Sequence, residues 1–180
     1  MRHKAIYGMT GMGKSWLLKR TAKQLRKHKQ KVMIWSGVGD LDFPKGCKVT
    51  FDVDEIEQWL AMPENFRSFV MLDEGSILFE EARSAKTHPN IHRLFTAGRH
   101  RGYTAYIATQ YPTSIPRKVR VNCAECFSFA LGDEESAKLV WADYNRQKFE
   151  EKPAWQQILS LQKLECLHFE QPNLIEKLKL

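Results

Sequence analysis

The sequence predicts an α/β fold in which a mostly parallel central sheet is covered by helices on both faces. Apolar, β-rich runs alternate with helical patterns along the 180 residues, which is typical of a parallel sheet. A glycine-rich loop separates the first strand pattern from the first helix pattern, and the apolar run at 66–72 reads as a strand buried on both faces. A chain of this length fits about one domain, so we expect a single domain over 1–180.

In the first half of the chain, short apolar runs mark the strands, and apolar residues three or four apart mark the helices. We expect a strand at 4–7, a helix from 15 to about 29, strands at 31–35 and 49–51, a helix ending at 60, and the strand at 66–72. Asp54 is the expected N-cap of the second helix, because a carboxylate accepts hydrogen bonds from the free N–H groups there.

In the second half of the chain, prolines and polar residues separate the elements. We expect helices over 75–86 and 90–98, strands at 103–109 and 124–131, a helix that Asp133 caps and that ends near 144, a helix over 152–161, and a last strand at 165–169. No internal repeat, low-complexity tract or linker interrupts this alternation of strand and helix.

The charge of the chain is unevenly distributed. Its net charge is +7 and its pI about 9.3, which suits a polyanionic partner. The first 39 residues contain ten Lys or Arg and no acid, and residues 83–124 contain eight more and again no acid. A solvated helix face explains the first group equally well. In the second group, residues 83–120 are the expected contacts for such a partner, with Arg117, Lys118 and Arg120 foremost.

The four cysteines give no metal signal. Cys123 and Cys126 have the spacing of zinc ligands, but no second pair completes a four-ligand site. Both lie in an apolar run, where buried thiols are typical. No signal-peptide pattern precedes the first strand, and no apolar run approaches the ~20 residues that span a bilayer. We therefore expect a reducing, cytosolic location and no direct insertion into a membrane.

The strongest motif is a loop of eight residues near the start of the chain. It reads Gly8, Met9, Thr10, Gly11, Met12, Gly13, Lys14 and Ser15. This fits the phosphate-binding pattern G-x-x-x-x-G-K-[ST], in which glycines let backbone N–H groups curl around a phosphate chain. Lys14 is expected to reach the β- and γ-phosphates, and Ser15 to place its hydroxyl on Mg²⁺ at the positive end of a helix. A chance glycine turn is the alternative, and the strand–loop–helix context argues against it.

A second motif follows the apolar run at 66–72, where Asp73 and Glu74 stand side by side. A P-loop enzyme uses an Asp at the end of such a strand to hold Mg²⁺. Glu74 is then placed to deprotonate a water molecule near the γ-phosphate, which predicts hydrolysis rather than transfer to a substrate hydroxyl. Two acids that open a helix would also be favoured by its dipole, and the P-loop upstream favours the catalytic interpretation.

A third group of residues flanks the strand at 103–109. Arg99 and Arg101 precede this strand, and Gln110 follows it. Gln110 is expected to hydrogen-bond the attacking water or to sense the γ-phosphate. Arginine does not lose its charge, so it suits the stabilisation of a transferring phosphoryl group. A solvated helix end is the alternative explanation for Arg99.

These three motifs, in this order, resemble the FtsK–HerA superfamily of DNA-pumping ATPases. The resemblance spans roughly residues 3–131, and its most specific part lies between residues 98 and 112. It implies a RecA-like (ASCE) P-loop ATPase motor domain with the sheet order 5-1-4-3-2 and with ATP and Mg²⁺ as ligands. It also implies that Gln110 is a sensor and that Arg99, or the nearby Arg101, is a finger donated to the neighbouring subunit.

In size, the chain looks most like the genome-packaging ATPases of tailless, membrane-containing icosahedral viruses. This likeness implies double-stranded DNA as cargo, a homo-oligomeric ring (pentamer or hexamer) and a capsid vertex or portal protein as partner. It also implies a location in the host cytoplasm and, at the packaging vertex, in the virion. A related motor for DNA transfer, repair or filamentous-phage extrusion is one alternative. A nucleotide-bound assembly scaffold with vestigial hydrolysis is another.

Overall fold

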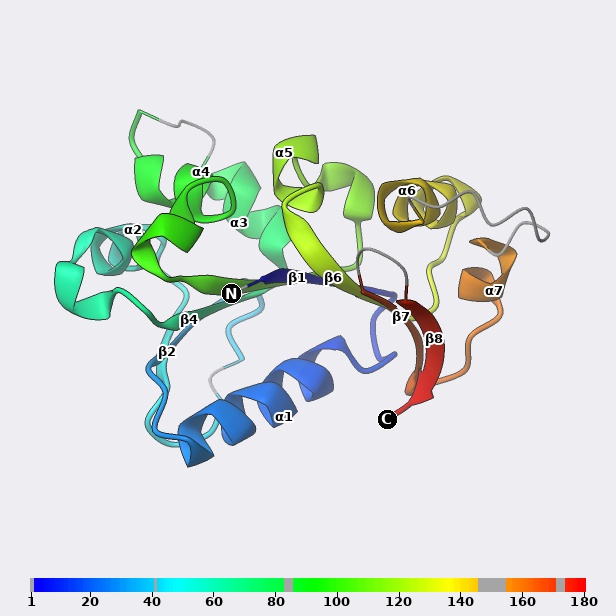
Figure 1. The fold of residues 1–180 in the computed structure, drawn as a ribbon, viewed down its shortest axis with the longest axis horizontal. Coiled ribbons are helices and arrows are strands. Elements are labelled where there is room, and N and C mark those ends of the chain that lie inside the picture. The colour runs from blue at the N-terminus through cyan, green and yellow to red at the C-terminus, as the bar shows by residue number, and fades with distance from the viewer. Residues whose placement is uncertain (1, 41, 83–85, 146–154, 171–173) are drawn as a thin grey trace.

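The computed structural model describes residues 2–40, 42–82, 86–145, 155–170 and 174–180. An eight-stranded sheet runs through the middle of the described part of the chain (Figure 1). Its strands are β1 (His3–Tyr7), β2 (Val32–Ser36), β3 (Lys48–Thr50), β4 (Phe69–Asp73), β5 (Thr104–Thr109), β6 (Cys123–Ser128), β7 (Glu165–Glu170) and β8 (Leu174–Lys179). Across the sheet their order is β3-β2-β4-β5-β1-β6-β7-β8.

The sheet is mostly parallel, as expected. The strands from β3 to β6 in this order pair in parallel, and β7 and β8 add antiparallel pairs beyond β6. Within it, the run β6-β1-β5-β4-β2 has the expected order 5-1-4-3-2. The order of the whole sheet differs from the expected one, because β3 pairs outside β2 and β7 and β8 extend the opposite edge. β8 is not among the expected strands, because its residues Leu-Ile-Glu-Lys-Leu-Lys do not alternate regularly between apolar and polar.

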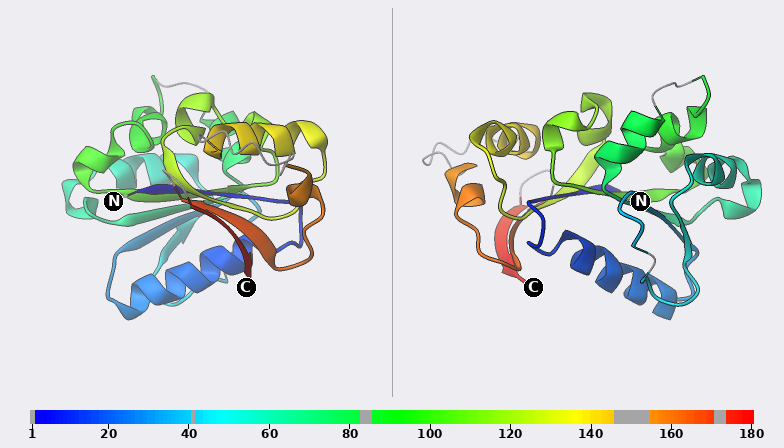
Figure 2. Two further views of the ribbon diagram at one scale, coloured as in Figure 1. Left: turned by 45° about the vertical axis from the view of Figure 1, so that its right-hand side comes forward. Right: turned by 180° about the vertical axis from the view of Figure 1, so that it is seen from behind.

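Helices cover both faces of the sheet, which confirms the predicted class (Figures 1 and 2). The helix α1 (Lys14–Lys27) lies against one face. The opposite face is covered by α2 (Val53–Ala61), α3 (Gly75–Glu81), α4 (Pro89–Leu94), α5 (Arg117–Arg120) and α6 (Glu134–Tyr144), with α7 (Trp155–Leu159) beside α6. Three short 3-10 helices are η1 (Pro63–Asn65), η2 (Gly98–Arg101) and η3 (Pro112–Ser114). Across the described ranges, no helix combines the length and the apolar character needed to cross a membrane.

The strand β4 shows how the apolar run at 66–72 is used. Val70 and Leu72 pack into the core between the sheet and helices α2 to α6, whereas Met71 packs toward α1. All three side chains are fully buried. Successive side chains of a strand point to opposite faces, so a strand covered on both faces needs an apolar residue at every position.

Two helix starts test the capping predictions. Asp133 has an extended backbone and accepts a 2.7 Å hydrogen bond from the N–H of Ser136, as expected. The prediction for α2 is wrong, because Asp52 rather than Asp54 is its N-cap. Asp52 accepts hydrogen bonds from the N–H groups of Asp54 (2.8 Å) and Glu55 (3.3 Å). Asp54 instead stands in the first turn, where a carboxylate is favoured by the helix dipole.

The helices expected over 75–86, 90–98 and 152–161 are shorter than predicted. The helix α3 ends at Glu81, and His92 contacts the Ala82 carbonyl just after it, at 2.6 Å. Pro89 opens α4, since proline has no N–H to lose in a first turn. Residues 83–85 and 152–154, which fall within the expected helices, lie outside the described residues.

The register of the sheet brings three strand ends to the same edge. Tyr7 of β1 pairs with Thr109 of β5, and Asp73 of β4 pairs with Ala108 of β5. The loop after β1, the acids after β4 and the residue after β5 therefore meet there. In open α/β sheets this carboxyl edge is where ligands bind.

Candidate active site

A hollow of about 350 Å³ opens at this edge of the sheet. It is lined by Thr10, Gly11, Gly13, Lys14, Ser15, Trp16, Val38, Asp73, Glu74 and Gln110. All but Trp16 and Val38 belong to the three predicted motifs, so the fold brings these motifs together. Neither exception was predicted from the sequence. Trp16 directly follows Ser15, and this position next to the motif could have indicated it. Val38 lies in the loop after β2, where no motif marks it.

The loop after β1 is anchored from several sides. Gly8 and Met9 donate backbone hydrogen bonds to carbonyls at the end of β5 and just after β6 (3.3 and 2.8 Å), and Met12 accepts one from Leu164 (3.1 Å). Gly13 has a φ of 125°, and a Cβ atom there would lie 2.9 Å from the side chain of Leu164. Only glycine fits this position comfortably. The loop is thus held open in front of the first turn of α1.

The side chain of Lys14 is buried at the hollow. Its Nζ lies 3.3 Å from the carbonyl oxygen of Met9 and 3.5 Å from Oε1 of Glu74. A buried ammonium group needs such partners, because an unpaired charge is costly to desolvate. The lysine therefore places a positive charge beside the loop, where a phosphate chain held by the backbone N–H groups would lie.

Ser15 and Asp73 meet although 58 residues separate them. The hydroxyl of Ser15 donates to the Asp73 carboxylate, with its Oγ 3.0 and 3.2 Å from the two carboxylate oxygens. Burial raises the pKa of the Asp73 carboxyl, and the hydrogen bond from Ser15 opposes this rise. Asp73 itself is fully buried at the end of β4. The strand therefore fixes the carboxylate rigidly beside the first turn of α1.

This pair of oxygen groups fits Mg²⁺. The ion prefers oxygen ligands and typically takes one or two from the protein, with the rest from phosphates and water. The described residues contain no cluster of three or more His, Cys, Asp and Glu side chains that would enclose a metal by itself. Ser15 and Asp73 would thus hold the ion only together with a phosphate in the hollow.

Glu74 has an unusual backbone. Its φ and ψ are 60° and 57°, the left-handed conformation, and it is buried. A residue other than glycine in this region costs of order 1–3 kcal/mol, and such strain clusters at functional sites. The turn leaves the Glu74 carboxylate in the hollow beside Lys14. No sequence motif indicates this left-handed conformation.

Gln110 is tied to the phosphate-binding loop. Its side-chain oxygen accepts a 2.9 Å hydrogen bond from the hydroxyl of Thr10. The preceding residue, Thr109, is fully buried and donates to the hydroxyl of Ser76 at 3.1 Å. The end of β5 is therefore fixed against both the loop and α3, and Gln110 is held where it can respond to a ligand in the hollow.

Arg99 does not lie at the hollow of its own chain. It is exposed in η2, which precedes β5, so it stands at the amino edge of the sheet. Burial, and next the nearby charge of Arg99, lower the pKa of His3 at the start of β1 to about 4. A strand of six residues spans about 20 Å, which is roughly the separation between Arg99 and the hollow.

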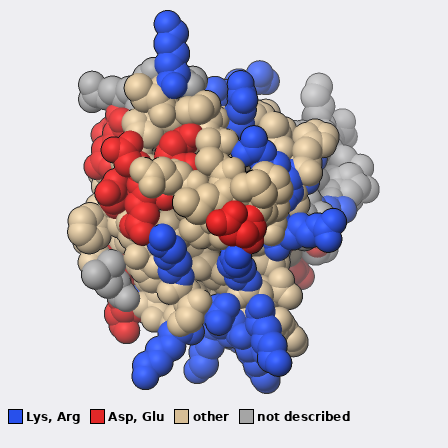
Figure 3. Space-filling model, turned by 90° about the vertical axis from the view of Figure 1, so that its left-hand side faces the viewer, with Lys and Arg blue, Asp and Glu red and all other residues tan. Residues whose placement is uncertain are grey.

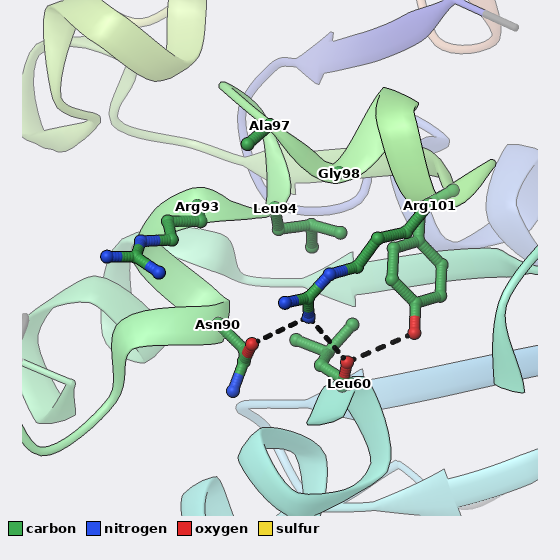
Figure 4. A pocket seen from close by; sticks show the side chains of 8 residues that line it. Leu60, Asn90, Arg93, Leu94, Ala97, Gly98 and Arg101 are labelled. Carbon is green, nitrogen blue, oxygen red and sulfur yellow. Dashed lines mark hydrogen bonds between the residues drawn. The ribbon is translucent and has the colours of Figure 1, made fainter. Parts of the chain in front are cut away.

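Arg101 is engaged within its own chain (Figure 4). Its guanidinium donates to Oδ1 of Asn90 (2.8 Å) and to the carbonyl of Leu60 (3.3 Å), and it lies 5.3 Å from the ring centroid of Phe66. The hydroxyl of Tyr103 donates to the same Leu60 carbonyl at 3.1 Å. These contacts hold Arg101 over the junction of α2 and α4. Arg99 is therefore the freer of the two candidate fingers.

One protein-family model matches the sequence of this chain. Residues 9–131 match the model described as Zonular occludens toxin (Zot), which is more than half of the chain. The chain belongs to the Zot family. No curated protein matches this Zot-family chain in sequence.

Solved structures of other proteins share the fold of this Zot-family chain. It is similar to the genome packaging NTPase B204 from Sulfolobus turreted icosahedral virus 2 in complex with AMPPCP, with a TM-score of 0.76, 18% identity and coverage of 98% of this chain and 95% of the other. It is also similar to the monomer form of the pCW3 conjugation coupling protein TcpA with ATPgS, with a TM-score of 0.72, 18% identity and coverage of 99% and 59%. These likenesses confirm the predicted α/β fold.

The basic block of this Zot-family chain divides into exposed and buried members. Arg117 and Lys118 are exposed on α5. Arg120 is buried, and its Nε lies 2.6 Å from the Asp143 carboxylate. The expectation that Arg120 contacts a polyanion is therefore wrong. Residues 83–85, at the start of the block, lie outside the described residues.

A second basic region lies along α1, where Arg20, Lys23 and Lys27 are exposed. Figure 3 views the left-hand side of Figure 1 and shows Lys and Arg gathered in its lower part, apart from a group of acids above them. The lower part of this view is where α1 ends in Figure 1. On this face, Lys and Arg are therefore most crowded in the lower part, although others lie near its top and right.

Proposed function

We propose that this Zot-family chain is a Mg²⁺-dependent ATPase that moves double-stranded DNA, and that it packages a viral genome into a preformed capsid. The single observation on which this depends is the convergence of Lys14, Ser15, Asp73, Glu74 and Gln110 on one hollow at the phosphate-binding loop. The similar fold of a protein named as a genome packaging NTPase supports the choice of cargo and process.

In the proposed reaction, each side chain has one task. Backbone N–H groups of the loop and Lys14 bind the β- and γ-phosphates, while Ser15 and Asp73 hold Mg²⁺. The bound ion would neutralise charge on the phosphate oxygens. Glu74 accepts a proton from the attacking water, and Gln110 orients that water and senses the γ-phosphate. The tie between Gln110 and Thr10 links this sensor to the loop.

We also propose that several copies of the chain form a ring. Arg99 stands at the edge of the sheet opposite to the hollow of its own chain, so it acts only on a neighbour's nucleotide. We propose a pentamer or hexamer in which each Arg99 completes the next site, with the ring seated at a capsid vertex or portal protein. Its place is then the host cytoplasm and the virion.

A second candidate is a motor that transfers DNA between cells. The observation that favours it is the likeness to a protein named as a conjugation coupling protein, which covers 99% of this chain. Both candidates share the hydrolytic site and the double-stranded cargo. A capsid or portal protein that binds the chain would support packaging over transfer.

The test of either motor is ATP turnover with and without double-stranded DNA. We expect Mg²⁺-dependent turnover that rises when duplex is added, and no turnover in Lys14→Ala, which lacks the cation at the β- and γ-phosphates. Nucleotide binding without turnover, with or without duplex, would support a scaffold with vestigial hydrolysis. It would contradict both motor functions.

A further inference from the structure

A second hollow, of about 500 Å³, lies beside the first turns of α1. It is lined by Trp16, Lys19, Arg20, Lys23, Asp42, Phe43 and Pro44. Trp16 lines this hollow and the phosphate hollow, so the two adjoin at its side chain. Trp16 also directly follows Ser15, the residue that contacts Asp73. Any ligand whose phosphates lie on the loop therefore has this second hollow next to it.

The walls of the second hollow combine aromatic rings with cations. The indole of Trp16 is 41% exposed, which is unusual for so large an apolar group, and the Arg20 guanidinium lies 5.1 Å from its ring centroid. The Nζ of Lys19 lies 5.4 Å from the ring centroid of Phe43. Cation–π contacts of this kind hold aromatic rings in place. Two ordered rings thus border the space before any ligand arrives.

We propose that the base of the bound nucleotide occupies this hollow, with Trp16 and Phe43 as its stacking surfaces. The proposal rests on the proposed nucleotide-binding function and extends it to the base. Ligand pockets of about 300–1,000 Å³ with apolar walls and a few polar groups are typical of small-molecule sites, and the hollow has this size and character. Stacking on aromatic rings is also tolerant of which base is bound.

The charges around the hollow favour a base over a nucleic-acid backbone. Lys19 is paired with Asp40 at 2.8 Å and lies 3.6 Å from Asp42. The Asp42 side chain is 97% exposed at the rim. A carboxylate there repels DNA phosphates but accepts hydrogen bonds from the amino groups of a base. Arg20 and Lys23 also line the hollow and are themselves exposed to solvent.

The test compares ATP with inorganic tripolyphosphate, which has the phosphates but no base. Trp16→Ala should weaken ATP binding roughly 5- to 100-fold, the range expected for one lost stacking contact. Phe43 lines only the second hollow, so Phe43→Ala should also weaken ATP binding and leave the affinity for tripolyphosphate unchanged. Trp16→Phe should restore most of the ATP affinity. Phe51 is an exposed aromatic residue that lines neither hollow, so Phe51→Ala should bind both ligands like the parent chain.

Three outcomes would overturn the proposal, and they are distinguishable. If Trp16→Ala loses ATP and tripolyphosphate affinity equally, or loses neither, the base does not stack on Trp16. If Trp16→Ala instead weakens binding of duplex DNA alone, the hollow belongs to a DNA surface. If the parent chain binds neither ATP nor tripolyphosphate, the proposed nucleotide-binding function itself is wrong, and the base site fails with it.

Discussion

Glu74 must satisfy two structural requirements. Its carboxylate must face the hollow, and its left-handed turn must end β4 and begin α3. Gly75, which follows, allows this turn because it has no Cβ atom. A Cβ atom there would lie only 2.4 Å from the side chain of Ile107. The strain at Glu74 is therefore tolerated where the carboxylate is needed, as is common at active sites.

This arrangement predicts separate effects on stability and activity. Glu74→Gly should have a free energy of unfolding about 1 kcal/mol higher than Glu74→Ala, because both variants remove the carboxylate beside Lys14 and only glycine adopts the left-handed conformation without strain. It should also abolish ATP hydrolysis, because the proposed base is lost. Glu74→Gln is the matched control: it keeps the strain, should bind ATP and should leave it uncleaved. Urea unfolding and single-turnover assays measure both effects, and hydrolysis at the parental rate in Glu74→Gln would refute the assignment of the base.

A different residue-scale prediction concerns His168 in β7. The carboxylate of Glu125, 3.7 Å away, and then that of Glu176, which lies 3.0 Å from Nδ1, raise the pKa of His168 against the effect of burial. Burial opposes the charge of Glu125, but contacts with His168 and Lys4 outweigh it and lower the pKa of Glu125 to about 2. These groups join β1, β6, β7 and β8 on one face of the sheet.

The directions of the pKa shifts of His168 and Glu125 predict how the stability of the fold depends on pH. The contribution of His168 is complete below its ordinary pKa of 6.5 and is lost as the pH rises through its raised value. The contribution of Glu125 is complete above its ordinary pKa of 4.5 and is lost as the pH falls toward 2. Unfolding by urea across this range should therefore show stability declining at both ends. In His168→Gln the decline above 6.5 should disappear, and an unchanged alkaline profile would contradict this account.

The four-residue helix α5 contains two cations with different roles. The exposed Lys118 is expected to bind DNA, whereas the buried Arg120 is expected to stabilise the fold. Arg120→Ala should destabilise the fold by about 3 kcal/mol, because it leaves the largely buried Asp143 carboxylate, 13% exposed, without its partner. Lys118→Ala should leave stability unchanged but weaken duplex binding, lowering the slope of log affinity against log salt by about 0.9. Denaturation curves and salt titrations of both variants check this. Equal effects of the two variants on DNA affinity would contradict the division.

The elements also show how far the sequence alone could lead. The apolar run of β4, the loop after β1 and the polar end of β5 were recognisable because each encodes its own local structure. The N-cap Asp52 was not recognised, because three acids within four residues, Asp52, Asp54 and Glu55, compete for that role and tertiary packing decides between them. β8 was missed because an edge strand gains its order from pairing with β7.

For the site, the motifs identified the residues but could not give their conformations. The left-handed turn at Glu74 and the engagement of Arg101 by Leu60 and Asn90 depend on contacts between distant segments. The same is true of Arg120, whose charge suggested a surface role until its pairing with Asp143 placed it inside. A charge read from the sequence shows neither its burial nor its partner.

At the scale of the whole molecule, the position of Arg99 predicts cooperation between subunits. ATP turnover per subunit should rise with protein concentration as rings form. Arg99→Ala and Lys14→Ala should each be inactive, with the first losing about 10³-fold or more in rate. Mixed rings should regain activity, because a Lys14→Ala subunit offers its Arg99 to an Arg99→Ala neighbour. Co-assembled variants that stay inactive would place Arg99 outside the neighbour's site.

We propose that ATP hydrolysis moves this protein along double-stranded DNA. Displacement of a fluorescent third strand from a triplex at one end of a duplex measures this movement directly. We predict displacement that requires ATP and Mg²⁺, takes longer on longer duplexes and is absent in Glu74→Gln. Turnover of ATP that duplex stimulates, without displacement of the third strand at any duplex length, would contradict the claim.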